Sequence, residues 1–414
     1  MTAELREASW LKDGAVARLL AVLDRDGEEA RVVGGAVRNE LLRRPVAEID
    51  VATTAVPEEV VRRVEAAGWK AVPTGIEHGT VTVVIKSHPF EVTTLREDVE
   101  TFGRKARVMF GRDWRADAER RDFTINALSA NADGNVFDYV GGLADIAERR
   151  VRFIGEPQQR IAEDYLRILR FFRFHAYFAD GAPDAAGLRA CIAARAGLDR
   201  LSRERVRMEL LKLLVAPRAA STLAVMGDSG LLGAVLGGVA YLGSFAKLAE
   251  IEAMLTLDAD AVRRLGALGV MVKEDAERLS QRLRLSKAES ERLLALELWW
   301  RMMPSSGEHA ARALLYHLGP QSFTDRVLLA WSRAEVGPAD IAWRELESLP
   351  QRWAVSDFPL KSADFTRRGV PVGPALGAAM RAAEEAWIAA DFPADGAVIE
   401  AIAEQAAHRF RAAG

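Results

Sequence analysis

The sequence has almost no cysteine and lacks any long hydrophobic run. Its 414 residues include one cysteine, Cys191, which excludes a disulfide framework and a cysteine-based zinc site and fits a reducing compartment. No apolar run approaches the roughly 18 residues of a membrane span, so we expect no membrane partner. The N-terminus also lacks the basic and apolar segments of a signal peptide. We therefore expect a cytoplasmic protein.

An excess of charge of one sign is missing as well. The net charge of −3 excludes a uniformly basic nucleic-acid coat and leaves any RNA or DNA contact to local patches. The six histidines are scattered, with no adjacent His-Asp pair, so a metal-dependent phosphohydrolase module is not expected. Hydrophobic residues make up 50% and charged residues 28%, which is ordinary for a helix-rich protein. The length predicts roughly two to four domains.

The most informative short stretch is residues 31–54, RVVGGAVRNELLRRPVAEIDVATT. It predicts a buried strand, a glycine turn, a short helix and a second strand. Gly34 and Gly35 would let backbone N–H groups approach an anion at the helix start, and Arg38 could add a charge-assisted contact to phosphate. Such a glycine pair before an arginine is a weak signal by itself, and the alternative is a turn that binds no phosphate.

Three carboxylates could complete a metal site beside that turn. Glu48 and Asp50 are two residues apart on the second expected strand, so both should project from one face. Residues 81–86 and 90–95 predict a hairpin, and Glu91 would become a third carboxylate if its strand neighbours the first. Carboxylates beside a phosphate site suit a nucleoside triphosphate held on magnesium. A solvated strand edge is the alternative.

Further along, residues 96–119 are highly charged, and we expect a long mobile loop there. Residues 158–178 predict a single helix, and from Ser202 onward almost every segment reads as helical. Along the helix at 158–178, a polar stripe recurs every three residues: Asp164, Arg167, Arg170 and Arg173. Such a stripe is either a binding surface or a solvated face with ion pairs.

Several blocks in fixed order resemble the bacterial-type (class II) CCA-adding tRNA nucleotidyltransferase and poly(A) polymerase family of the polymerase-β superfamily. Between Val32 and Lys212 they are GGAVR, EIDVATT, RRDFTINAL, DYVGGLAD, EDYLRILRFFRF and LSRERVRMELL. The C-terminal FPLKSAD is a weaker match. The resemblance implies a nucleotide site formed by Gly34, Gly35, Arg38, Arg121, Asp122, Asp164, Arg167, Arg170 and Arg173.

The resemblance also implies roles for individual residues. Glu48 and Asp50 would ligate two Mg2+ ions, and the strand argument above adds Glu91 as a third catalytic carboxylate. Gly35 and Arg38 would hold the triphosphate. Arg121 and Asp122 would contact the nucleotide, with Asp122 at the ribose 2′-OH. Asp164 and Arg167 would read the base, and Arg170 and Arg173 would complete the site.

Base chemistry supports the assignment of Asp164 and Arg167. Cytosine and adenine both offer an exocyclic amine beside a ring-nitrogen acceptor. A carboxylate accepting from the amine and an arginine donating to the ring nitrogen would suit both bases. Uracil and guanine would place a carbonyl oxygen against the carboxylate and be rejected.

The chain departs from the family pattern at two positions. Glu48 and Asn39 stand where the family usually has aspartate. The extra methylene of Glu48 shifts its oxygens by about one bond length, which the strict geometry of magnesium tolerates poorly. Asn39, on the helix surface beside Arg38, need not contact a metal.

The resemblance implies an α+β fold, with a small polymerase-β-like nucleotidyltransferase head of mixed sheet and helices followed by helical segments. We expect a head at 1–140, a neck at 141–225 with the base-reading helix, a body at 226–345 and a tail at 346–414 that contacts tRNA. Basic residues outside the site would hold the acceptor-stem backbone: Arg203, Arg205, Arg207 and Lys212.

The expected reaction is attack of the tRNA 3′-OH on CTP or ATP, with release of pyrophosphate. The implied partner is the tRNA 3′ end, not DNA, and the oligomeric state stays open. Poly(A) polymerase, a CC- or A-adding specialist and a non-catalytic RNA-binding relative are the alternatives.

Overall fold

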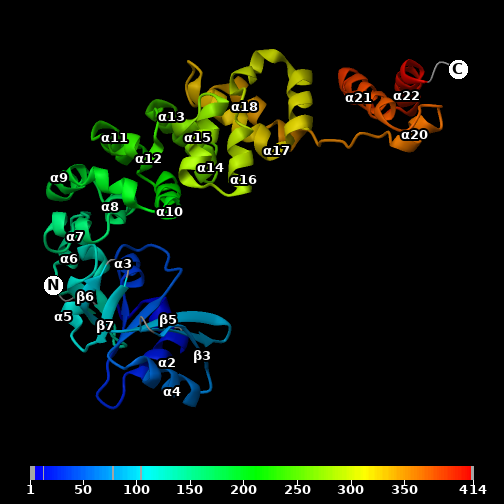
Figure 1. Cartoon of the computed structure of the whole chain (residues 1–414). Helices are drawn as coiled ribbons and strands as arrows, with labels where there is room; N and C mark the ends of the chain where they lie inside the picture. The colour runs from blue at the N-terminus through cyan, green and yellow to red at the C-terminus, as the bar shows by residue number, and fades with distance from the viewer. Residues whose placement is uncertain (1–4, 13, 77–78, 103–104, 412–414) are drawn as a thin grey trace. The chain divides into compact units, whose positions relative to one another are not determined.

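The computed structural model describes residues 5–12, 14–76, 79–102 and 105–411, and the chain forms two compact units, Met1–Gly237 and Gly238–Gly414 (Figure 1). The first unit holds all the strands that the structure describes, together with helices. The second unit is helical wherever it has regular structure in its described residues. The predicted α+β head followed by helical segments is confirmed.

A seven-stranded mixed sheet organises the first unit, in the order β3-β4-β5-β2-β1-β8-β9. Its strands are β1 (Ala30–Val33), β2 (Asp50–Thr53), β3 (Lys70–Gly75), β4 (Thr80–Ile85), β5 (His88–Thr94), β8 (Ser129–Ala130) and β9 (Val136–Phe137). β2 and β5 run parallel, and the other neighbouring strands are antiparallel. The predicted hairpin of residues 81–86 and 90–95 is confirmed as β4, which begins and ends one residue earlier than expected, and β5, which is one residue longer.

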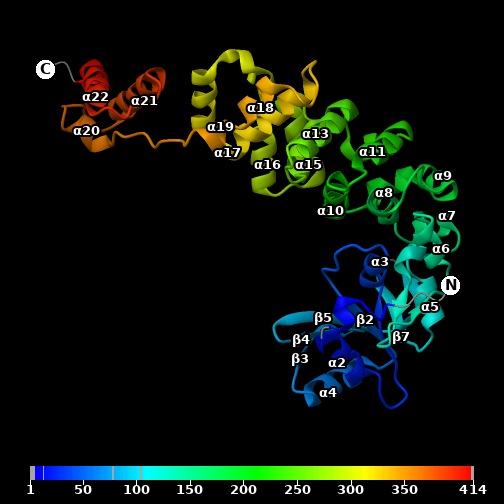
Figure 2. The same ribbon diagram turned by 180° about the vertical axis from the view of Figure 1, so that it is seen from behind.

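Two helices cover one face of this sheet. α2 (Gly14–Leu23) and α4 (Pro57–Ala66) lie side by side in both views (Figures 1 and 2). In β4, Val81, Val83 and Ile85 alternate with less buried residues, and all three are at most 2% exposed. Burying each such side chain contributes roughly 1.5–3 kcal/mol. The opposite face of β4 and β5 is therefore left to polar residues.

The segment 96–119 is not a long irregular loop, so that prediction is wrong. It forms a separate two-stranded hairpin, β6 (Arg96–Phe102) and β7 (Lys105–Phe110), followed by helix α5 (Trp114–Glu119). A hairpin outside the main sheet can solvate both faces, so high charge does not exclude strands there. The Asp113 carboxylate starts α5 by accepting the N–H groups of Arg115 and Ala116.

The remaining helices of the first unit are α1 (Ser9–Lys12), α3 (Gly35–Leu41), α6 (Gly142–Ala147), α7 (Pro157–Glu163), α8 (Leu166–Phe178), α9 (Ala185–Ala193), α10 (Arg203–Leu214), α11 (Ala219–Asp228) and α12 (Leu231–Leu236). The single helix predicted for 158–178 is wrong, because α7 and α8 are separated by Asp164 and Tyr165. Asp164 is extended (φ −153°, ψ 108°), and its Oδ1 accepts the N–H of Leu166 at 3.1 Å. A short polar side chain that bonds the backbone in this way ends one helix and caps the next.

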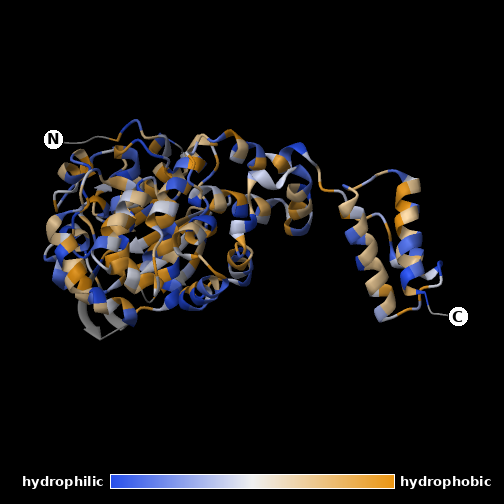
Figure 3. Ribbon diagram, turned by 90° about the horizontal axis from the view of Figure 1, so that it is seen from above, coloured by the Kyte–Doolittle hydropathy of each residue, from blue (hydrophilic) through white to orange (hydrophobic). Residues whose placement is uncertain are grey.

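The second unit contains α13 (Leu242–Met254), α14 (Ala261–Gly269), α15 (Lys273–Leu283), α16 (Lys287–Leu294), α17 (Glu308–Arg333), α18 (Ile341–Glu347), α19 (Leu349–Arg352), α20 (Ser362–Thr366), α21 (Pro374–Ala389) and α22 (Gly396–Phe410). α17 is broken at Gly319 (φ 72°), beside Pro320. Polar and apolar residues are interleaved along the helices (Figure 3). Among the described residues, no helix is long and apolar enough to cross a membrane.

Candidate functional site

A cavity of about 630 Å³ lies in the first unit, between the start of β2 and the helices that follow the sheet. It is lined by Gly34, Gly35, Arg38, Glu48, Asp50, Arg120, Arg121, Asp122, Asn126, Asp164, Leu166, Arg167, Arg170, Phe174 and Arg205. Every residue expected to bind nucleotide or metal is among them except Arg173. The third carboxylate, Glu91, lines a neighbouring cavity, which also borders Glu48 and Asp50.

The carboxylates gather where β2 begins beside the middle of β5, its parallel neighbour. Asp50 is the first residue of β2 and is in register with Glu91 of β5, so the two side chains leave the sheet on the same face. Glu48 precedes β2 by two residues, so its predicted place on the strand is wrong. Partial burial and the negative charges of Glu91 and Glu48 raise the pKa of Asp50, while Arg121 opposes them. The three carboxylates therefore repel one another, and the positive charge of Arg121 does not fully offset their negative charge.

These side chains have the chemistry of a magnesium site. Carboxylate oxygens are the ligands that Mg2+ prefers, and one or two carboxylates with substrate phosphates usually complete its shell. The charges that raise the pKa of Asp50 are those that a cation would neutralise. Within the described part of the chain, no three or more His, Cys, Asp or Glu residues could hold a metal ion by themselves. Water molecules and a bound phosphate would supply the remaining ligands.

The glycine turn shapes the phosphate side of the cavity. Gly34 has a left-handed backbone (φ 68°), and a Cβ there would come within 3.2 Å of Arg121 Nη1. Its N–H already donates to the Leu128 carbonyl at 2.9 Å, so it is not available to an anion. α3 has only seven residues. Positive charge must therefore come from side chains, chiefly Arg38 and Arg121, and not from a long helix.

Arg38 is buried, with 8% of its surface exposed, and hydrogen bonds hold its guanidinium in place. Its Nε and Nη2 donate to Asn39 Oδ1 at 3.1 and 2.8 Å, and its Nη1 donates to Asn126 Oδ1. Its guanidinium carbon lies 4.0 Å from the centre of the Phe178 ring. Burial and the nearby positive charge of Arg173 lower the pKa of Arg38 to about 10, so it stays charged near neutrality. Asn39 thus orients an arginine, as its surface position beside Arg38 allows.

Asp122 joins the sheet side of the cavity to α8. Its Oδ1 accepts the N–H of Phe123 and Asn126 Nδ2 at 2.9 and 3.0 Å, and its Oδ2 accepts Arg170 Nε at 2.7 Å. Burial alone would raise the pKa of Asp122, but these donors outweigh it and the pKa is lowered. Asp122 is therefore a buried, fixed carboxylate that faces the cavity.

Arg173 is the predicted site residue that the structure leaves outside the cavity lining. Its Nε donates to Glu209 Oε2 at 2.6 Å, and Arg170 Nη1 lies 3.8 Å from Glu209 Oε1. Arg173 therefore acts on the site through Glu209 and Arg170, through its contact with the Phe174 ring that lines the cavity, and through its repulsion of Arg38.

Asp164 and Arg167 lie at the junction of α7 and α8. Asp164 Oδ2 accepts Arg205 Nη2 at 2.6 Å, and Arg167 Nη1 donates to the Arg160 carbonyl at 2.6 Å and to Glu163. Arg205 lines the cavity. Our expectation that Arg205 would lie outside the site is wrong, because α10 packs beside α8 and directs it toward Asp164.

Sequence reasoning also missed Asn126 and Arg120 as lining residues. Asn126 connects Arg38 to Asp122, and both partners had been recognised. Its place four residues after Asp122, in the block RRDFTIN, was the available signal. Arg120 lies beside a predicted arginine, and its Nε donates to Asp117 Oδ1 at 2.8 Å.

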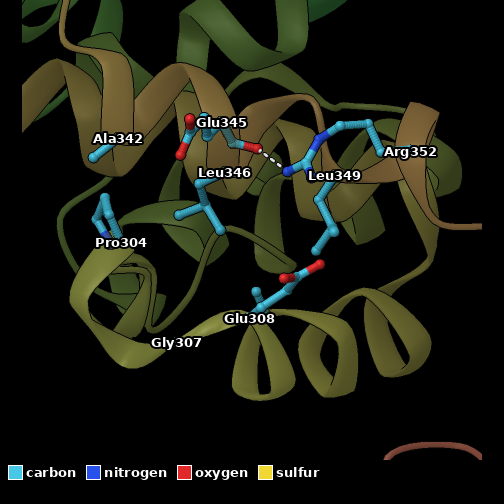
Figure 4. A pocket seen from close by; sticks show the side chains of 9 residues that line it. Pro304, Gly307, Glu308, Ala342, Glu345, Leu346, Leu349 and Arg352 are labelled. Atoms are coloured by element: carbon cyan, nitrogen blue, oxygen red, sulfur yellow. Dashed lines mark hydrogen bonds between the residues drawn. The ribbon is translucent and has the colours of Figure 1, made fainter.

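A smaller pocket in the second unit, of about 210 Å³, shows a different arrangement (Figure 4). Arg352 turns back along its own helices and donates to the Glu345 carbonyl at 2.7 Å. Leu346 and Leu349 supply apolar walls, and Glu308 approaches from α17. Without a group of converging carboxylates and arginines, this pocket has no comparable chemistry.

Comparison with known proteins identifies relatives of this chain. A family model described as the poly A polymerase head domain matches residues 30–152, and one described as the probable RNA and SrmB-binding site of polymerase A matches residues 185–242. The crystal structure of the Bacillus stearothermophilus CCA-adding enzyme in complex with CTP is similar, with a TM-score of 0.76 and 26% identity. The match covers 96% of this chain and 98% of that chain.

Two sequence relatives match over most of their length. The mitochondrial CCA tRNA nucleotidyltransferase 1 of Danio rerio is 32% identical over 394 residues, which cover 92% of this chain and 88% of that protein. The CCA-adding enzyme of Limosilactobacillus fermentum is 32% identical over 375 residues, which cover 87% of this chain and 89% of that protein. The chain therefore belongs to the family of CCA tRNA nucleotidyltransferases.

Proposed function

We propose that this chain adds CMP and AMP from CTP and ATP to the 3′ end of tRNA and releases pyrophosphate. One observation carries the proposal. Glu48 and Asp50, the arginines beside the glycine turn and the pair Asp164 and Arg167 all line a single cavity. Phosphate chemistry and base selection can thus act on one bound nucleotide.

The triphosphate would bind on the side of Arg38 and Arg121. Arg38 approaches the cavity with its orientation fixed by Asn39 and Asn126, so little side-chain entropy is lost when phosphate binds. Arg121 is held by Asp117, which accepts its Nη2 at 3.1 Å. Charge-assisted contacts from two positioned arginines supply the attraction for the phosphates.

Glu48 and Asp50 would hold Mg2+, with Glu91 beside them. When bound, the metal would favour ionisation of the attacking 3′-OH and stabilise the leaving oxygens. The three carboxylates would hold the metal where β2 and β5 lie side by side. Removal of divalent ions with EDTA should abolish incorporation of CMP and AMP, and excess Mg2+ should restore both.

Sugar and base would be recognised on opposite sides of the bound nucleotide. Asp122, ionised and fixed by Arg170 and Asn126, can accept a hydrogen bond from a ribose 2′-OH. Asp164 would accept the exocyclic amine of C or A, and Arg167 would donate to the ring nitrogen. Arg205 would hold the Asp164 carboxylate in position through their ion pair.

Arg170 and Arg173 would complete the site from α8. Arg170 orients Asp122, and Arg173 shares Glu209 with Arg170. We also propose the domain ranges of the sequence prediction, a head at 1–140, neck at 141–225, body at 226–345 and tail at 346–414. The similarity to bacterial CCA-adding enzymes supports a cytoplasmic reaction, although the vertebrate relatives are named as mitochondrial.

An assay of product length tests the proposal. Purified protein is given tRNA ending before CCA and each labelled nucleotide, singly and in pairs. We expect two additions with CTP alone and a third when ATP is added. A long A tract would instead indicate poly(A) polymerase, and a stop after CC or a requirement for preadded CC would indicate a specialist. No incorporation with any nucleotide would indicate a non-catalytic relative.

A further inference from the structure

Arg160 lies on α7, outside the lining of the candidate active site, and lines a separate cavity of about 400 Å³. Its side chain is 12% exposed. Its Nη2 donates to two backbone carbonyls, those of Arg120 and Arg121, the second at 2.5 Å. These carbonyls come just after the last residue of α5, where carbonyl groups have no partner within the helix. The guanidinium therefore fixes the backbone that presents Arg121 and, one residue later, Asp122 to the active-site cavity.

The main chain of Arg160 meets the side of the same cavity that is proposed to read the base. Its carbonyl accepts Arg167 Nη1 at 2.6 Å. Glu163 joins the two side chains, because its Oε2 accepts Arg160 Nη1 at 2.7 Å and Arg167 Nη1 at 2.5 Å. Burial and then the charge of Arg167 lower the pKa of Arg160, while Glu163 opposes them. Arg160 and Arg167 are therefore coupled both by hydrogen bonds and by charge.

Helix continuity does not supply this link between the two sides of the cavity. α7 ends at Glu163, and the extended residue Asp164 separates it from α8. The proposed sugar-binding and base-reading groups belong to different elements, since Asp122 follows α5 and Arg167 lies in the first turn of α8. A base stands at a fixed distance from its own sugar and phosphates, so the spacing of these groups must match that distance.

We propose that Arg160 is a positioning residue that sets where Arg167 meets the base, by joining Arg167 to the backbone of Arg121. The inference rests on the proposed function and adds a residue that itself lies outside the nucleotide cavity. A planar guanidinium suits this task, because its fork of donors meets two carbonyls and a carboxylate at once. Lysine would keep the charge beside Glu163 but would not hold that geometry.

A double-mutant cycle on the full-length chain tests the assignment. The value of kcat/KM for CTP is measured with tRNA ending before CCA, for the unaltered chain, Arg160→Ala, Arg167→Ala and the double variant. Arg160→Ala should lower kcat/KM about tenfold in the unaltered chain, because a displaced contact group stabilises the transition state less. In the Arg167→Ala chain the same substitution should cost less than about threefold, because residues that act through one another are not additive. The KM for tRNA should change by less than about twofold throughout.

Arg63 is the matched control, because it has the same pattern of bonds and does not line the active-site cavity. Its Nη1 donates to the Leu23 and Arg25 carbonyls at the end of α2. Its Nε donates to Glu59 at 2.5 Å. Arg63→Ala should lower the midpoint of thermal unfolding, as Arg160→Ala does, but leave kcat/KM for CTP unchanged. If an alanine variant fails to fold, Arg160→Lys and Arg63→Lys replace the pair, and Arg160→Lys should lower kcat/KM about threefold only while Arg167 is present.

An equal loss from the Arg160 substitution with and without Arg167 would overturn the assignment, because Arg160 would then act on the fold alone. A loss in the Arg63 variant as large as that in the Arg160 variant would overturn it as well. Absence of turnover in the unaltered chain would instead contradict the proposed function. The cycle would then be read from the dissociation constant for CTP, measured by equilibrium dialysis without tRNA. Additive effects on that constant, or no binding of CTP, would overturn the positioning role.

Discussion

Two clusters of arginines and carboxylates in this molecule differ in how their charges are balanced. In the second unit, Glu252 is 1% exposed, and its two oxygens accept Arg263 Nε and Arg264 Nε at 2.6 and 2.7 Å. At the cavity of the first unit, the pKa of Asp50 is raised, partly by Glu91 and Glu48.

Two further acids of the second unit, Asp325 and Asp260, are also paired with arginine. Asp325 accepts Arg292 Nε at 2.6 Å, and Arg292 also donates to Asp260 at 2.8 Å. Burial alone would raise the pKa of Asp260, but the Arg263 N–H and Arg292 outweigh it and the pKa is lowered. Arginine density is therefore a poor sign of function. A set of charges left unbalanced beside a cavity is a better one.

The largest effect that this comparison predicts is on turnover, at Asp50. Asp50→Ala should lower kcat for both CMP and AMP addition at least about a thousandfold, because it removes a proposed magnesium ligand. The midpoint of thermal unfolding should not fall, since the substitution also relieves repulsion from Glu91 and Glu48. Kinetics and calorimetry on one preparation measure both. A substantially lower unfolding midpoint would mean that partner charges stabilise the Asp50 carboxylate, as they do for the acids of the second unit.

Glu48 sharpens that result, because the family usually has aspartate there. Glu48→Asp should keep or raise kcat, and Glu48→Ala should lower it strongly. Near-normal turnover in Glu48→Ala would contradict the two-carboxylate site. Its exposed position before β2 predicts little change in stability for either variant.

The opposite outcome is expected in the second unit, at Asp325. Asp325→Ala should lower the free energy of unfolding by about 3–5 kcal/mol, because it removes the buried partner charge of Arg292 and one of the two buried partner charges of Arg263. Below the new unfolding midpoint, the KM for CTP should be unchanged. Asp391→Ala is the control, since its side chain is 46% exposed and its pairs should contribute less than about 1 kcal/mol. Equal effects of the two substitutions would remove the distinction between buried and surface networks.

His175 tests a third case, a buried ionisable group outside both clusters. It is 3% exposed in α8, and burial together with Arg218 lowers its pKa to about 4. As the pH falls below about 6.5, the unfolded state takes up a proton that the folded state refuses until about pH 4. Stability should thus fall across that window by about 3 kcal/mol from this group.

Denaturant unfolding of His175→Gln measures that contribution. The variant should show a shallower loss of stability between pH 6.5 and 4 than the unaltered protein, with parallel curves above pH 7. Identical slopes throughout would show that the histidine is solvated and already protonated in the folded state.

The sequence predicted the head and most of the site because the signals were local. Alternation in β4 marks one buried face, and the register of Asp50 with Glu91 follows from the neighbouring strands. The role of Glu91 was predicted only on the condition that its strand neighbours β2, because the order of strands in a sheet depends on tertiary packing. The break at Asp164 was missed because apolar spacing continues across it, although aspartate can cap a new helix.

Other features could not be read from spacing at all. Arg205 enters the cavity because α10 packs beside α8, and its position in the sequence gives no sign of that contact. The hairpin of β6 and β7 was missed because charged residues interrupt the apolar alternation by which strands are recognised. Tertiary packing decided both cases.

The smallest predicted effect is on base choice, and it depends on the Asp164 carboxylate. Asp164 has two tasks in this structure, since Oδ1 caps α8 and Oδ2 holds Arg205. Asp164→Ala removes both, so loss of the cap alone could cost about 1 kcal/mol of stability. The expected change in discrimination is one to two decades, because a hydrogen bond to a charged group contributes roughly 1.5–3 kcal/mol.

Asp164→Asn separates the two tasks. Asparagine keeps an oxygen that can cap α8 but replaces the other oxygen with an amide that donates to a carbonyl. UTP should therefore become a measurable substrate while kcat/KM for CTP falls, with the unfolding midpoint nearly unchanged. Arg167→Ala should weaken CTP and ATP without admitting UTP, because the carboxylate still repels the uracil oxygen. Incorporation from each nucleotide alone measures all three variants. If Asp164→Asn lost activity with CTP, ATP and UTP alike, the residue would act through Arg205 and the helix junction, and base selection would have to reside elsewhere in the cavity.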